Sequence, residues 1–214
     1  ALTKSGIEAE NYPFCTIDPN IGIVEVPDKR LTEIDALINS KKIIKTAIEF
    51  VDIAGLVKGA SQGEGLGNKF LSNIRNVDAI IHVVRCYENE NVTHVEGNID
   101  PKRDIEIIET ELILKDLETV TKRIEKIKRD VKAGRKLEEN KLLENLLNHL
   151  NNGNNLNQLD IENELMKELN LLTDKPILFV VNVSEDDIIQ TEHTEQLIKL
   201  HEYLNSRNEN YINI

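Results

Sequence analysis

The chain has 214 residues, 40% of them hydrophobic, so it is long enough to fold around a sizeable core. Its net charge of -12 argues against a surface that attracts nucleic acid or anionic membrane as a whole, although a local basic patch remains compatible with it. The two cysteines lie outside any disulfide or zinc-site spacing, and no segment approaches the roughly 18 to 20 apolar residues that span a bilayer. These totals predict a globular, cytoplasmic protein.

Short apolar runs rich in β-branched residues predict five strands, at residues 21–26, 43–51, 79–84, 177–183 and 211–214. The run 79–84 is apolar except for His82, as expected of a strand covered by helices on both faces. Helices are predicted at 67–76 and 192–206. The pattern indicates an α/β domain with a mostly parallel sheet and helices on both faces, made of residues 1–100 and 174–214.

Between these parts, residues 101–173 lack strand patterns and predict a helical insertion. Apolar residues in the 4, 3, 4, 3, 4 spacing of a coiled-coil seam occur at Ile113, Leu117, Val120, Ile124, Ile127 and Val131. A second apolar stripe follows Gly134 and consists of Leu143, Leu146, Leu147 and Leu150. We therefore expect an antiparallel helical hairpin that turns at residues 133–135, then a loop at 151–155 and a helix at 161–172.

The chemistry begins at residue 52, where a predicted strand ends in Asp52 and Gly55 follows in the D-x-x-G spacing. A carboxylate at the carboxyl edge of such a sheet can hold Mg²⁺ through water, while the Gly55 N–H can face a γ-phosphate. A strand-end Asp is just as often a turn former or a helix cap. However, half of the 10 glycines fall within residues 55–67, which indicates a loop rather than a helix or strand.

At this point two segments resemble one family. DIAGLVKGASQGEGLGN at residues 52–68 is similar to the switch II segment of the Obg-like ATPase (YchF) family of P-loop NTPases, and NYPFCTIDPN at residues 11–20 is similar to its switch I. The resemblance implies that Thr16 meets Mg²⁺ and the γ-phosphate together with Asp52. It also implies that Leu56 replaces the catalytic glutamine of Ras-like GTPases, so that backbone, phosphate or K⁺ must position the attacking water.

Base recognition is expected after the strand at 177–183, where GTPases carry N-K-x-D. Here the sequence is Asn182, Val183, Ser184 and Glu185, which resembles the N-x-x-E of the family and implies weakened guanine selection and a preference for ATP. The alternative is an Asn/Ser turn that caps the next helix. RCYENE at residues 85–90 also resembles the family, and it places Tyr87 as a candidate contact to the adenine.

The sequence also departs from the family, because it contains no G-x-x-x-x-G-K-[ST] phosphate-binding loop. In the family this loop stands directly before the segment that residues 1–7 resemble. We therefore expect the chain to be a fragment that lacks this loop and the C-terminal TGS domain, and to be inactive alone.

The predicted hairpin carries a basic segment, residues 122–136, with eight basic and two acidic side chains. Such a surface fits phosphate, although it also fits a solvated coiled coil. Family resemblance implies ribosome association, so the hairpin is a candidate ribosome contact; neither DNA nor membrane is expected as a partner. The expected function is Mg²⁺-dependent ATP hydrolysis, with a GTPase or a protein- or RNA-binding module without catalysis as alternatives.

Overall fold

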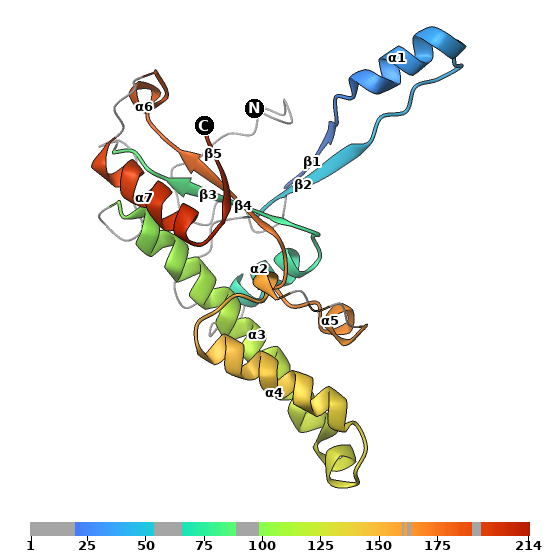
Figure 1. The fold of residues 1–214 in the computed structure, drawn as a ribbon, viewed down its shortest axis with the longest axis vertical. Coiled ribbons are helices and arrows are strands. Elements are labelled where there is room, and N and C mark those ends of the chain that lie inside the picture. Colours follow the sequence, from blue (N-terminus) through green and yellow to red (C-terminus); the bar gives the residue numbers. More distant parts are fainter. Residues whose placement is uncertain (1–19, 54–65, 89–98, 160, 162–163, 190–193) are drawn as a thin grey trace. The chain divides into compact units, whose positions relative to one another are not determined.

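The computed structural model describes residues 20–53, 66–88, 99–159, 161, 164–189 and 194–214 (Figure 1). The chain divides into two compact units, Ala1–Gly55 and Leu56–Ile214. Among the residues that the structure describes, no helix combines the length and the apolar composition needed to cross a bilayer.

The first unit holds an antiparallel strand pair, β1 (Asn20–Glu25) and β2 (Ala47–Asp52). Asn20 lies opposite Asp52, so the predicted magnesium ligand is the last residue of its strand, as expected. Both strands were predicted, but the apolar pattern alone does not determine their antiparallel pairing.

Between these strands lies a helix, α1 (Lys29–Ile38), that is absent from the sequence-based expectations. Its start is set by Asp28, whose carboxylate accepts a hydrogen bond from the Arg30 backbone N–H at 3.0 Å. Its end is set by Asn39, which adopts left-handed backbone with φ of 48°.

The second unit contains the parallel sheet that the sequence predicts, with strand order β3-β4-β5. The strands are β3 (Ile80–Arg85), β4 (Ile177–Asn182) and β5 (Asn210–Asn213). On one face, residues of β3 and β4 pack against α3 (Pro101–Lys132) and α7 (Glu195–Ser206) around the buried Phe179. On the other face Ile81, Val83 and Ile212 are exposed, so the described helices cover one face more completely than the other.

The predicted hairpin is present as α3 and α4 (Leu137–Asn151), which run side by side in Figure 1. Asp100 caps α3 by accepting a hydrogen bond from the Arg103 N–H at 3.1 Å. The turn is made by Gly134 and Lys136, both with positive φ. All residues of the two predicted apolar stripes belong to one core cluster, which confirms the predicted seam.

After α4 the chain forms a short 3-10 turn, η1 (Leu156–Gln158), and the helix α5 (Glu164–Leu169). The helix predicted at 161–172 is therefore shorter than expected, because Asn170 leaves helical geometry with φ of 45°. The remaining helices are α2 (Leu66–Arg75), close to the prediction at 67–76, and α6 (Glu185–Ile189). The domain boundaries near residues 100 and 173 stay a prediction, since α3 contacts β3 and α7 as well as α4.

Candidate nucleotide site and its relatives

The two segments predicted to read the base lie at the carboxyl ends of neighbouring strands. Arg85 at the end of β3 is in register with Asn182 at the end of β4. Beyond them, the Cys86 backbone N–H donates to the Asn182 carbonyl at 2.8 Å. Tyr87 and the turn after β4 thus come from adjacent positions on one edge of the parallel sheet, where such folds bind ligands.

The turn after β4 is held by Ser184. Its hydroxyl lies 2.6 Å from a carboxylate oxygen of Asp187 and also accepts a hydrogen bond from the Asp187 backbone N–H at 3.1 Å. This is the capping arrangement that was the structural alternative for this tetrapeptide. It leaves Glu185 exposed as the first residue of α6, and within the described part of the chain the side chains of Asn182 and Glu185 have no hydrogen-bond partner. The cap and a base-reading role are therefore compatible.

Val183 occupies a different environment from its two neighbours. Its side chain is 7% exposed and belongs to the core beneath the sheet, and its backbone N–H donates to the Ile214 carbonyl at 3.0 Å. A lysine at this position would have to bring its charge out of that core. The replacement of lysine by valine in the sequence therefore has a packing reason, and we expect Val183 to act through its backbone.

Tyr87 is fixed by Arg85. The Arg85 guanidinium lies 4.9 Å from the centre of the Tyr87 ring, and its Nε donates to the Tyr87 carbonyl at 3.1 Å. The cysteine between them is buried, and this burial together with the Asp187 carboxylate raises the pKa of Cys86 to about 11. Cys86 is thus part of the core beneath the sheet, and its raised pKa disfavours the reactive thiolate form.

Of the residues predicted to meet magnesium and the γ-phosphate, only Asp52 is among the described residues. Asp52 is exposed at the end of β2, whereas Thr16, Gly55 and Leu56 lie outside the described residues. No group of three or more His, Cys, Asp or Glu side chains that could hold a metal occurs among the described residues. The donor chemistry of Asp52 fits Mg²⁺, which takes oxygen ligands and commonly only one or two from the protein.

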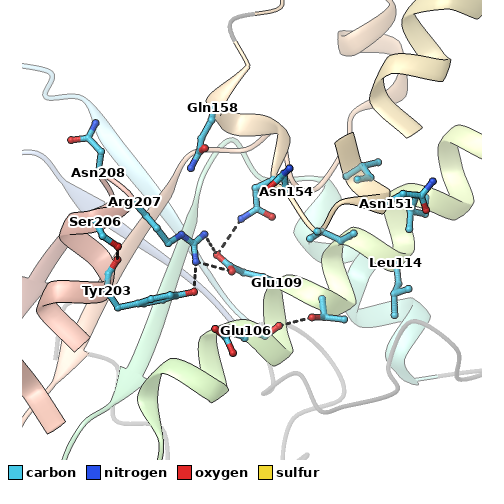
Figure 2. A pocket seen from close by; sticks show the side chains of 16 residues that line it. Glu106, Glu109, Leu114, Asn151, Asn154, Gln158, Tyr203, Ser206, Arg207 and Asn208 are labelled. Carbon is cyan, nitrogen blue, oxygen red and sulfur yellow. Dashed lines mark hydrogen bonds and ion pairs between the residues drawn. The ribbon is translucent and has the colours of Figure 1, made fainter. Parts of the chain in front are cut away.

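A separate groove of about 770 Å³ lies where α3, the segment after α4 and the end of α7 meet (Figure 2). Its floor holds an ion pair between Arg207 and Glu109, and its rim carries the side-chain amides of Asn151, Asn154, Gln158 and Asn208. None of the described residues predicted for the nucleotide site lines this groove. No sequence pattern pointed to it, because its parts are far apart along the chain.

Comparison with known proteins decides the family. Residues 1–113, just over half of the chain, match the model of the 50S ribosome-binding GTPase family. The chain is 51% identical over 213 residues to the ribosome-binding ATPase YchF of Bacillus subtilis, and 53% identical over 211 residues to that of Mycoplasma genitalium. The chain belongs to the YchF family. The alignments cover 97% of this chain and 58% of each relative, so the chain spans less than two thirds of the curated relatives.

A solved structure supports the same assignment. The YchF GTPase of Schizosaccharomyces pombe superposes with a TM-score of 0.77 at 37% identity, covering all of this chain and 60% of that chain. This match confirms the predicted P-loop NTPase fold class and, with the alignments above, the predicted family. The individual site residues stay predictions, since membership in the YchF family does not by itself assign a role to each of them.

Proposed function

We propose that this chain provides the base-reading and γ-phosphate-sensing parts of a Mg²⁺-dependent ATPase that acts at the ribosome. The observation that carries the proposal is the edge formed by β3 and β4, where Arg85 lies in register with Asn182, so that the segments carrying Tyr87 and Glu185 leave adjacent strand ends. Support comes from the names of the relatives, which are ribosome-binding ATPases. Action at the ribosome also implies a cytoplasmic protein.

In this proposal one pair of residues binds the base and another pair binds Mg²⁺. The Asn182 amide offers a donor and an acceptor to the base, and the Glu185 carboxylate accepts hydrogen bonds from exocyclic or ring N–H groups. Compared with aspartate, glutamate adds one methylene and loses the fixed reach that selects guanine, so we expect ATP to be preferred. Asp52 and the Thr16 hydroxyl would hold Mg²⁺, which supplies positive charge at the phosphates when bound.

Catalysis is assigned to Gly55 and Leu56. The Gly55 N–H, with no side chain in the way, would donate to the γ-phosphate. Leu56 has no polar group to activate water, so its role would be to exclude other water while the backbone, the phosphate or K⁺ positions the attacking one.

A GTPase is the second candidate, because both the matching family model and the fission yeast structure are described as GTPases. Isothermal titration with ATP and GTP in the presence of Mg²⁺ separates the two. It is run on the 214-residue chain and on an extended version, in which the N-terminal segment of the Bacillus subtilis relative is joined before Ala1. Binding of ATP at lower concentration than GTP supports the proposal. Preference for GTP favours the GTPase, and no binding by either version leaves a protein- or RNA-binding module.

We further propose that the α3–α4 hairpin is the ribosome contact. Four of its cations, all exposed on α3, have no ion-pair partner among the described residues: Lys126, Lys128, Arg129 and Lys132. At 100° per residue Lys126, Arg129 and Lys132 fall on the side of α3 away from the seam residues Val120, Ile127 and Val131, and Lys128 falls on its flank. By contrast Lys122, Arg123, Arg135 and Lys136 form ion pairs within the hairpin and with α5. The unpaired cations therefore outnumber the exposed Glu125 on the outward side of α3, and this basic surface fits the phosphates of RNA.

A further inference from the structure

The end of α2 is fastened to the segment that follows α5 by reciprocal hydrogen bonds. Arg75, the last residue of α2, donates from Nη1 to the carbonyls of Leu169 at 3.1 Å and Asn170 at 3.3 Å. In return, the Asn170 side-chain amide donates to the Arg75 carbonyl at 2.9 Å. That carbonyl is one of those left without a partner at a helix end, so Asn170 acts as its cap across 95 residues of sequence.

The same arginine also reaches the hairpin. Its Nη2 donates to the Thr119 hydroxyl on α3 at 3.2 Å. One turn earlier on α3, the fully buried Asp116 accepts hydrogen bonds from the backbone N–H groups of Leu172 at 3.0 Å and Thr173 at 2.8 Å. Helix α2, residues 169–173 and α3 are thus joined in one polar network, centred on the Arg75 guanidinium.

A lysine reinforces this junction. Lys175 donates from Nζ to the Val77 carbonyl at 2.7 Å and to the Asn170 side-chain oxygen at 3.0 Å. Lys175 is 8% exposed, so both bonds are sheltered from water and hold residues 75–77 firmly against the strand entry at β4. A displacement of α2 cannot occur without breaking these bonds or carrying the partners with it.

The position of α2 in the sequence relates this junction to the proposed nucleotide site. This helix begins at Leu66, ten residues after Leu56, and so follows along the chain the segment proposed to meet the γ-phosphate. In P-loop NTPases such segments are ordered by the γ-phosphate and released on hydrolysis. On the hairpin side of the junction, α3 runs without interruption from Thr119 to the cations at 126–132.

We propose that Arg75 is a positioning residue that couples the nucleotide state to the α3–α4 hairpin, so that the nucleotide sets the affinity of the hairpin for RNA. This inference rests on the proposed function. By linkage, the factor by which nucleotide changes RNA affinity equals the factor by which RNA changes nucleotide affinity. The hydrogen bonds of Arg75 are the physical connection that transmits this coupling between the nucleotide and the RNA.

The test measures binding to 50S ribosomal subunits with a non-hydrolysable ATP analogue and with ADP. It uses whichever of the two versions defined above binds nucleotide. We expect the unmodified protein to show a ratio of dissociation constants of roughly 5-fold or more, the usual lower range of allosteric coupling. In Arg75→Gln this ratio falls below about 2, while the affinity for the ATP analogue without subunits stays within about 3-fold.

Two further variants keep the result decisive if Arg75→Gln folds poorly. Asn170→Gly removes the cap but keeps a residue suited to the observed positive φ, and it should also lower the ratio. Arg123→Gln is the matched control, because Arg123 joins α3 to Glu139 and Glu168 without touching α2, and it should retain the ratio.

The outcomes separate the two proposals. ATP binding with a ratio of one in the unmodified protein, or an unchanged ratio in both Arg75→Gln and Asn170→Gly, overturns the coupling but not the ATPase. Failure of both versions to bind nucleotide overturns the proposed function and the coupling together.

Discussion

Arg207 and Glu109 form a two-point ion pair that joins the end of α7 to α3. The Arg207 Nη2 lies 2.6 Å from Glu109 Oε1, and its Nη1 lies 3.0 Å from Oε2 (Figure 2). The two side chains are 22% and 11% exposed, so water screens the pair poorly. Asn155 adds a hydrogen bond to the same carboxylate at 3.1 Å. The pair fixes the hairpin to the helix that covers the sheet.

Removing the arginine should therefore be costly. We expect Arg207→Met, which keeps most of the apolar stem, to lower the free energy of unfolding by about 3 kcal/mol, since the buried Glu109 loses its compensating charge. Urea denaturation followed by circular dichroism measures the change. Lys199→Met is the control, because the Lys199–Glu195 pair is 69% and 83% exposed and should contribute little to stability. Equal losses in both variants would show that burial does not matter here.

A feature could be predicted from the sequence when it depends on residues that are close together in the chain. The strands and the α3–α4 seam produce short periodic patterns of apolar residues, and both were predicted. Helix α1 was not predicted although Asp28 is a favourable cap, and none of its residues is buried in the structure. The helix at 161–172 was drawn too long, since nothing local shows that Asp116 binds the backbone N–H groups of Leu172 and Thr173.

The contacts that join the elements could not be predicted at all. Arg75 and Asn170 are separated by 95 residues, and Arg207 and Glu109 by 98. The sequence contains many more charged residues than ion pairs between distant elements, and only the fold determines which of them meet. The placement of Tyr87 and Asn182 was more predictable, because both lie at or just after strand ends, and strand ends of a parallel sheet share one edge.

His82 should make the protein less stable in mild acid. Its ring packs against Phe179, with 5.5 Å between ring centres, and burial lowers the pKa of His82 to about 4 from its usual 6.5. Between these values the unfolded chain binds a proton that the folded chain does not, so stability falls as the pH drops from 6.5 toward 4. The slope contributed by one such group is at most about 1.4 kcal/mol per pH unit.

Urea midpoints for the unmodified chain and His82→Leu test this expectation. From pH 7.5 to 7.0 both should show the same pH dependence, which serves as the internal control. Below pH 6.5 the unmodified chain should lose stability more steeply than the variant. Parallel curves down to pH 4.5 would mean that the His82 ring is protonated in the fold.

Glu185 should govern the choice of base. In the version that binds nucleotide, we expect Glu185→Asp to raise GTP affinity relative to ATP by about 10-fold, equivalent to roughly 1.4 kcal/mol, because the shorter carboxylate restores the acceptor of the GTPase motif. Val183 is left unchanged, since its side chain is in the core. Glu185→Gln, which has the same length without the charge, should bring no such gain. Titration with both nucleotides gives the ratio, and an unaltered ratio in Glu185→Asp would remove Glu185 from the site.

The outward face of α3 should supply the salt-dependent part of ribosome binding. Reversing three of its unpaired cations, with Lys126→Glu, Arg129→Glu and Lys132→Glu, should weaken binding to 50S subunits by at least about 10-fold at 0.1 M salt. Because each lost phosphate contact removes roughly one unit from the slope of log affinity against log salt, that slope should fall by about 3. The control variant reverses Lys41, Lys42 and Lys199, which are also exposed but lie outside the hairpin. If the control loses as much affinity as the hairpin variant, the effect is one of net charge; if neither loses affinity, the hairpin is a solvated coiled coil and the ribosome contact lies elsewhere.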